Sequence, residues 1–128
     1  MTVVAVLLGG LIGTGLRLGF DALLPHDPQQ FPVSTLLINL LGSFALGLLV
    51  ARVWPTAPPW LRFGLGTGVL GSFTTFSAVM ASLLTLTPAS PLLALAYLAA
   101  SLIGGLGAAA LGLRAGRIRP AAAIGADE

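Results

Sequence analysis

Four long apolar runs dominate the pattern of hydrophobic and polar positions along this chain. They cover about 3–24, 33–53, 61–85 and 92–113, and short proline-containing stretches separate them. About 20 apolar residues are enough for a helix to cross the ~30 Å hydrocarbon core of a bilayer. The pattern therefore predicts an all-α membrane protein: one domain of four transmembrane helices, followed by a tail over 114–128 that begins with a cluster of arginines. The first run lacks a positively charged start, so it is expected to be a membrane helix rather than a cleaved signal peptide.

The third run is interrupted at its middle by glycine, hydroxyl and aromatic residues, GSFTTFS over 71–77. Polar groups at membrane depth are costly, and a break in a helix survives there only inside protein or beside a polar cavity. A straight helix over 61–85 would also be longer than the ~30 Å core at 1.5 Å per residue. We therefore expect a broken third helix and an ion path or ion site at the break.

The second and fourth runs each carry polar side chains on one helix face. Thr35, Asn39 and Ser43 follow each other at intervals of four, and Tyr97 and Ser101 do the same. The Asn39 amide has up to four hydrogen bonds to satisfy, so it either bonds to a neighbouring helix or lines a pore. For the Tyr97 face, helix packing and a polar track are both open.

Glycine pairs at intervals of four predict close helix packing in the first run, Gly9 with Gly13 and Gly15 with Gly19. The GLGTG stretch over 64–68 has no preceding strand and no following Lys-Ser/Thr, so it is interpreted as another packing face rather than a phosphate loop. Arg17 lies near the end of the first run. It either reaches to the membrane surface or attracts anions to a pore mouth.

Composition narrows the functional classes. The 128 residues are 56% hydrophobic and 8% charged, against roughly 25% charged in soluble domains. The chain has no cysteine and no lysine, and its six arginines sit at membrane boundaries, so nucleic acid is not an expected partner.

The placement of the arginines predicts the orientation of the chain. Five arginines fall on the side of the two termini, and Arg17 alone falls on the other side. This bias predicts cytoplasmic termini in a cell membrane. The five are Arg52, Arg62, Arg114, Arg117 and Arg119.

No catalytic constellation is present in the sequence, so an enzyme is not expected. His26 lies in a polar loop without metal-ligand spacing to other residues. The acids are Asp21 and Asp27 near the end of the first run and two in the tail, which disfavours a proton-coupled small multidrug-type exporter. Neutral N–H and O–H donors and aromatic ring edges suit a small, strongly hydrated anion instead. A non-transporting membrane scaffold is a further alternative.

Three stretches together resemble the CrcB/Fluc family of fluoride ion channels. GGLIGTGLR (9–17), TLLINLLGSFALG (35–47) and GVLGSFTTFS (68–77) follow the order of that family's motifs in its first three helices. The resemblance implies four helices per subunit, an antiparallel dimer with two narrow pores, and passive export of toxic fluoride from the cytoplasm.

The resemblance also implies roles for individual residues. Asn39 would line the pore, Phe76 would face fluoride with its ring edge, and Arg17 would stand in the vestibule. Hydroxyl candidates along the path are Thr35, Thr75, Ser77, Tyr97 and Ser101. A structural sodium ion at the dimer centre would be held by the main-chain carbonyls of Gly71 and Thr74.

The chain departs from the family's pattern in three places. The usual signature continues Ser-Thr-Phe, but here Ser77 is followed by Ala78 and Val79, and Gly105 stands where the polar track often has a hydroxyl. A pore lined only by copies of this chain would lack those groups. With the arginine bias, this leaves two expectations for the partner: a second copy, or an inversely oriented homologue forming a heterodimer.

Overall fold

A computed structural model describes residues 1–24, 27 and 30–118, and every structural statement below concerns these residues. They are folded into helices, four of which are long and apolar enough to cross a membrane, which confirms the all-α fold with four spans. The first two spans are α1 (Thr2–Leu23) and α2 (Val33–Arg52). The last span is α6 (Pro91–Arg117).

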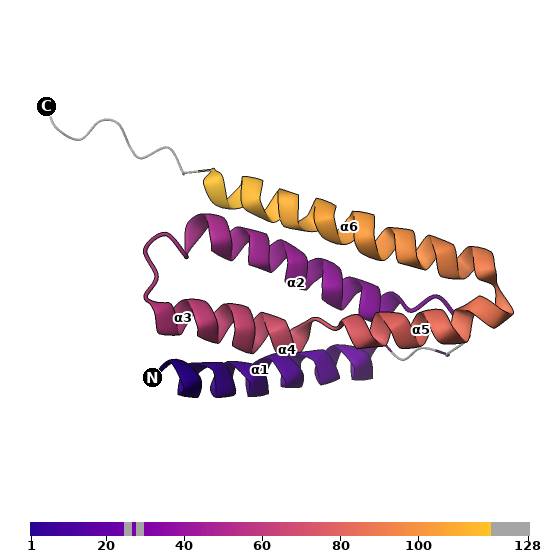
Figure 1. Cartoon of the computed structure of the whole chain (residues 1–128), viewed down its shortest axis with the longest axis horizontal. Coiled ribbons are helices and arrows are strands. Elements are labelled where there is room, and N and C mark those ends of the chain that lie inside the picture. The colour runs from indigo at the N-terminus through magenta and orange to yellow at the C-terminus, as the bar shows by residue number, and fades with distance from the viewer. Residues whose placement is uncertain (25–26, 28–29, 119–128) are drawn as a thin grey trace, which may run out of the picture.

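The third span is broken, as predicted, and consists of four segments. It begins as α3 (Pro59–Phe63), continues through the π-helix η1 (Gly64–Leu70) into α4 (Gly71–Phe73), and resumes as α5 (Phe76–Ala89). Figure 1 shows α3 and α5 in line with each other on either side of the interruption at Thr74 and Thr75.

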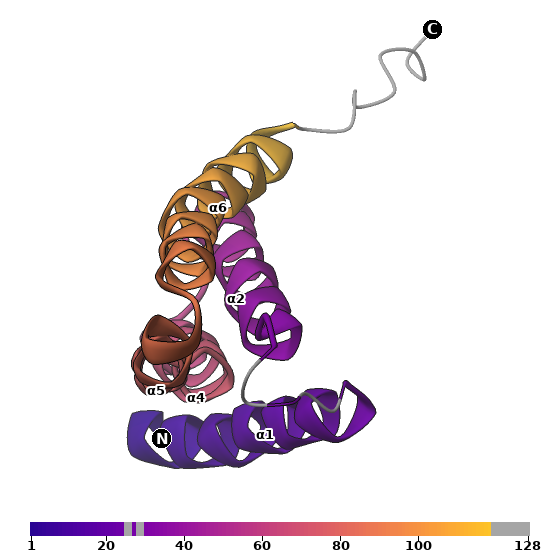
Figure 2. The same ribbon diagram turned by 90° about the vertical axis from the view of Figure 1, so that its right-hand side faces the viewer.

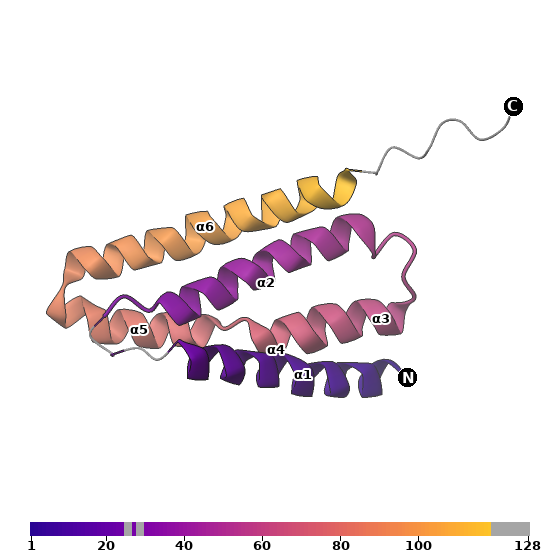
Figure 3. The same ribbon diagram turned by 180° about the vertical axis from the view of Figure 1, so that it is seen from behind.

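The helices lie alongside one another in the order α1, broken third span, α2 and α6. The view from behind shows α1 against α3 and α4, with α2 between the broken span and α6 (Figure 3). Seen from the end, α1 lies across one side of the bundle and α6 covers the opposite side (Figure 2). The N-terminus, the α2–α3 connection and the end of α6 all lie at one end of the bundle (Figure 1).

Close backbone contact holds α1 to the π-helical segment. A side chain added at Gly9 would collide with the carbonyl oxygen of Gly64, and one added at Gly13 would collide with that of Val69. The packing predicted for Gly9 and Gly13, and for the glycines of 64–68, is therefore observed. Among the described residues, no atom lies within 4 Å of a Cβ added at Gly15 or Gly19, so the predicted packing of this second pair is not observed there.

A second glycine contact joins α2 to α6. A Cβ at Gly47 would meet the carbonyl of Ala109, and one at Gly112 would meet the carbonyl of Phe44. Each helix thus presents a glycine to a backbone oxygen of the other, the small-residue packing that membrane helices use in place of a hydrophobic driving force.

Helix ends differ from the sequence prediction at the last connection. The stretch 86–91 was expected to be a loop, but α5 continues to Ala89 with Pro88 in its last turn, and only Ser90 separates it from α6. The Thr85 hydroxyl donates to the carbonyl of Ser82, and the Thr87 hydroxyl donates to that of Leu83. Side chains thus supply hydrogen bonds to backbone carbonyls in the final turns of α5. The fourth span also extends past 113 to Arg117. The remaining tail, 119–128, and His26 lie outside the described residues.

Large apolar side chains cover the outside of this bundle. Leu84, Leu92 and Leu106 are each more than 70% exposed, whereas Tyr97, Ile38 and Leu86 are almost fully buried. Such exposure is untenable in water but normal for helices that face lipid or a partner subunit.

Candidate functional site

The helix break is built by two extended threonines. Thr74 has φ −77° and ψ 156°, and Thr75 has φ −149° and ψ 121°. The Thr74 peptide N–H and hydroxyl both donate to the carbonyl oxygen of Leu70, each at 2.9 Å, and so close α4. The Thr75 hydroxyl accepts the peptide N–H of Ala78 at 3.2 Å and so caps the start of α5. Threonine is a favoured residue at this N-cap position, which explains why the helix restarts here.

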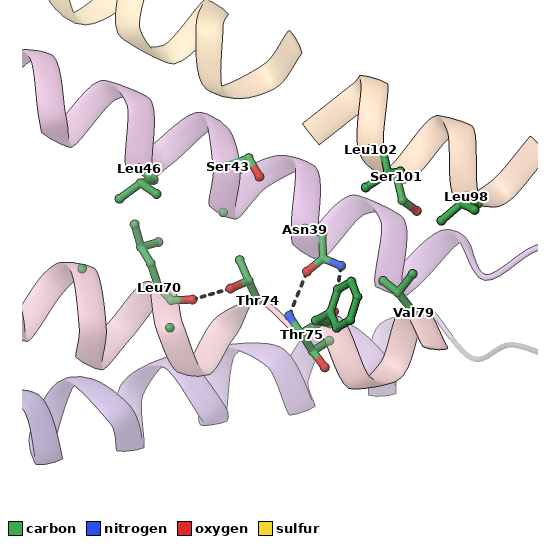
Figure 4. A pocket seen from close by; sticks show the side chains of 14 residues that line it. Asn39, Ser43, Leu46, Leu70, Thr74, Thr75, Val79, Leu98, Ser101 and Leu102 are labelled. Atoms are coloured by element: carbon green, nitrogen blue, oxygen red, sulfur yellow. Dashed lines mark hydrogen bonds between the residues drawn. The ribbon is translucent and has the colours of Figure 1, made fainter. Parts of the chain in front are cut away.

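Asn39 on α2 holds the break open. Its Nδ2 donates to the carbonyl oxygen of Thr75 at 3.0 Å, and its Oδ1 accepts the Thr75 peptide N–H at 2.8 Å (Figure 4). In an unbroken helix the Thr75 N–H would donate to the carbonyl of Gly71. The Asn39 amide therefore bonds both to the N–H and to the carbonyl of Thr75, the two groups that would bond within the helix if it were continuous. Of the two alternatives for Asn39, the interhelical hydrogen bond is observed; lining a pore stays a prediction.

A groove of about 350 Å³ runs past the break, between α2, the third span and α6. Phe76 on the wall of the groove is 71% exposed. Figure 4 shows Asn39 and Thr75, which also line the groove, facing each other. The groove brings together half of the residues predicted for an anion path, namely Asn39, Thr75, Phe76 and Ser101, and both residues predicted for sodium. Its lining is Asn39, Gly42, Ser43, Leu46, Gly66, Leu70, Gly71, Thr74, Thr75, Phe76, Val79, Leu98, Ser101 and Leu102.

A second cavity of about 440 Å³ lies on the other side of Thr75. It joins three further predicted path residues, Arg17, Thr35 and Ser77, and the hydroxyls of Thr75 and Ser77 are 3.2 Å apart at its wall. The other lining residues are Leu18, Asp21, Ile38, Ala78 and Ala81. Because Thr75 lines both spaces, the break forms the partition between them.

Tyr97 lies in neither cavity. It is fully buried, its ring meets Phe31 edge-on at 5.5 Å, and its hydroxyl makes no hydrogen bond, although the hydroxyls of Thr35, Ser82 and Ser101 are its polar neighbours. The buried Ser101 hydroxyl is likewise without a partner. The hydroxyls of Tyr97, Ser101, Thr35 and Ser82 thus gather in one polar region shared by α2, α5 and α6.

Sequence reasoning missed Ser82 and Ser34. Ser82 follows Thr75 by seven residues, two helical turns, and this spacing on α5 could have revealed it. The Ser34 hydroxyl donates to Oδ1 of Asp21 at 2.6 Å. No local pattern reveals that bond, because the 25–32 connection separates the two residues.

The three departures from the family pattern can also be located. Val79 is 5% exposed and packs in a cluster with Leu86, Ala94 and Tyr97 while also reaching the groove. Ala78 lines the second cavity. A side chain added at Gly105 would start 3.7 Å from the Ser43 hydroxyl, so a hydroxyl at this position would extend the polar lining from α6.

Comparison with known proteins agrees with this architecture. The family described as "CrcB-like protein, Camphor Resistance (CrcB)" matches residues 4–113. A Bacillus subtilis protein named Fluoride-specific ion channel FluC 2 is 41% identical over 88% of this chain and 86% of its own length. The Halalkalibacterium halodurans protein of the same name is 40% identical over 86% of this chain and 81% of its own. Fluoride-specific ion channel FluC of Deinococcus radiodurans is 46% identical over 82% and 86%. With four helices suited to a bilayer and a match over nearly all of them, this chain is a multi-pass membrane protein of the CrcB-like family.

Proposed function

We propose that this protein is a subunit of a fluoride-selective channel that lets fluoride leave the cytoplasm passively. The observation that carries the proposal is the break at Thr74 and Thr75, where neutral polar groups from three spans meet around one groove. The relatives named as fluoride-specific channels identify the ion.

The chemistry of the groove suits a small anion that must shed water. Hydroxyl and amide donors replace hydration without fixing the ion as a buried cation would. Asn39 keeps one amide N–H beyond its bond to Thr75, and the Ser101 hydroxyl is uncommitted. The exposed ring of Phe76 offers its electropositive edge. Thr75, Ser77 and Thr35 continue the donors toward Arg17, which would raise the anion concentration at the mouth. Tyr97 would support this track from behind, next to Thr35 and Ser101.

The alternatives fit less well. A proton-coupled exporter needs an ionisable group at membrane depth, and the carboxylates in the described part of the chain are Asp21 in the last turn of α1 and Asp27 beyond it. A scaffold that only packs through its glycine faces does not require a helix break held open by an interhelical amide.

Sodium at the dimer centre is part of the proposal. A hard cation prefers oxygen ligands, and the break leaves main-chain oxygens available. The Thr75 N–H is diverted from Gly71 to Asn39, and the extended backbone of Thr74 turns its carbonyl off the helical path. Gly71 is exposed on the surface of the subunit, as a ligand shared with a partner must be. These carbonyls would supply charge compensation and hold two subunits together.

The groove needs a second subunit to become a pore, because its Phe76 wall is open to the outside. We propose an antiparallel dimer, and favour an inversely oriented homologue as the partner. Val79 contributes a small apolar side chain where the family pattern has phenylalanine, and a homologue could supply the missing ring. The strong arginine bias favours one fixed orientation for this chain.

Fluoride efflux from proteoliposomes tests the proposal. This chain is reconstituted alone and together with a homologue from the same genome, and released fluoride is read with an electrode. Efflux from the pair but not from the single chain supports the heterodimer; efflux from the single chain supports a homodimer. The absence of efflux from both preparations, with dimers intact, would overturn the channel assignment.

A matched pair of variants links efflux to the groove. Phe76→Leu removes an aromatic edge at the break and is expected to lower efflux at least tenfold, whereas Phe63→Leu changes an equally apolar, half-exposed ring on α3 and leaves efflux near wild type. Equal rates for the two variants would exclude Phe76 from the path.

A further inference from the structure

Asp21 carries a negative charge into the second cavity and is held there by Ser34. Asp21 lies in the last turn of α1, and Ser34 lies in the first turn of α2 with 1% of its surface exposed. The 2.6 Å bond from the Ser34 hydroxyl fixes one carboxylate oxygen against α2. Hydrogen bonds to a charged acceptor are short and about twice as strong as neutral ones, so the carboxylate has a defined position.

An acid is an unfavourable choice at this place in the fold. The C-terminal end of a helix carries partial negative charge, which disfavours a carboxylate in its last turn. The bond from Ser34 does not require the charge, since the side-chain oxygen of asparagine would also accept it, although in a weaker neutral bond. Joining α1 to α2 therefore explains the hydrogen bond but leaves the negative charge unexplained.

The charge shares its cavity with Arg17, one turn earlier on α1. Both residues line the 440 Å³ space that ends at Thr75 and Ser77. In the described part of the chain, Arg17 forms neither a hydrogen bond nor an ion pair with Asp21. The two opposite charges thus act separately on the same cavity, where a pair in contact would have neutralised both.

We propose that Asp21 opposes Arg17 and limits the access of anions to the pathway at this end. The inference rests on the proposed function, because it concerns the same permeating ion. Charges that line a cleft set the local concentration of small ions and hence the rate at which they arrive. Arg17 raises that concentration for an anion and Asp21 lowers it, so flux is held below the rate that Arg17 alone would permit. Ser34 is a positioning residue, which keeps the carboxylate from pairing with Arg17.

The test compares fluoride efflux of the wild type, Asp21→Asn and Ser34→Ala at two ionic strengths, in the assembly that conducts. Asp21→Asn preserves the acceptor for Ser34 and removes only the charge. A unit charge about 10 Å from the path changes the local anion concentration about twofold in water, so we expect a two- to threefold faster efflux at low salt. At about 0.5 M salt the Debye length falls below 5 Å and the difference should disappear. Ser34→Ala keeps the charge and is not expected to raise efflux.

Each other outcome overturns the inference. If Asp21→Asn matches the wild type at low salt while the dimer is intact, the charge does not act on the ion. If the efflux of Asp21→Asn rises equally at both ionic strengths, the effect comes from altered packing. The same holds if Ser34→Ala increases efflux as much as Asp21→Asn does. The wild-type rate is measured in the same series, so a protein that passes no fluoride at all refutes the channel function instead of the role of Asp21.

Discussion

At the scale of single residues, the Asn39 side chain holds the helix break in place through its two bonds to Thr75. Asn39→Ala would leave the Thr75 N–H and carbonyl without partners at membrane depth, a loss of about 1–3 kcal/mol for each unsatisfied group. We expect efflux to fall to background and the Thr75 amide proton to exchange faster with deuterium. Ser43→Ala is the matched control, because Ser43 lines the same groove from the same helix without bonding to the break.

A conservative substitution separates the two tasks of Asn39. Asn39→Asp retains an oxygen that accepts the Thr75 N–H, so exchange of that amide should stay slow, while a carboxylate in the groove should repel fluoride and abolish efflux. Fast exchange in Asn39→Asp, or slow exchange in Asn39→Ala, would show that the break is held by something other than this amide.

Residue identities were predictable where chemistry alone singled them out. A lone asparagine in a leucine-rich span, hydroxyls beside a glycine and an arginine in an apolar run are all expensive in lipid, and the structure gathers them around two adjoining cavities. Their partners were not predictable. The bond between Asn39 and Thr75 depends on the register of α2 against the third span, and that between Asp21 and Ser34 depends on the course of a connection between helices.

At the scale of helices, two neighbouring glycines of α1 offer a direct comparison. Gly13→Ala would press a Cβ into the carbonyl of Val69 on η1 and force the helices apart, at a cost of about 1–3 kcal/mol. Gly15→Ala meets no atom of another helix and gains helix propensity. In mixed detergent micelles, Gly13→Ala should therefore unfold at a lower denaturant concentration than the wild type, whereas Gly15→Ala should not. Equal destabilisation by both variants would contradict the observed packing of α1 on η1.

The broken span shows how far element prediction reaches. Its existence followed from length and from the polar cluster, and the threonine that restarts α5 is a recognisable cap. The π-helical turn over Gly64–Leu70 was not foreseen, because glycines allow several helical hydrogen-bond patterns and contact with α1 selects among them. The extension of α5 to Ala89 was missed because Pro88 falls in the last turn, where the chain keeps its helical course despite the lost N–H.

At the scale of the whole molecule, the remaining question is how the chain is oriented in the membrane. The ends of α2 and α6 and the start of α3 lie at one end of the bundle, and they carry Arg52, Arg62, Arg114 and Arg117 (Figure 1). Arg17, in the second half of α1, lies nearer the other end of the bundle. A chain that inserts equally both ways should carry little such bias, so this distribution supports a single orientation.

The chain's lack of cysteine makes this orientation measurable without background. Single cysteines at Thr56, in the α2–α3 connection, and at Gln30, before α2, are both on exposed residues and lie at opposite ends of the bundle. In intact cells a membrane-impermeant thiol reagent should label Gln30→Cys strongly and Thr56→Cys almost not at all. Comparable labelling of both would mean dual insertion, and the chain could then form an antiparallel dimer with itself. Exclusive labelling of Gln30→Cys instead requires the inverted half of any antiparallel pore to come from another polypeptide, which also assigns to that partner the aromatic ring that Val79 does not supply.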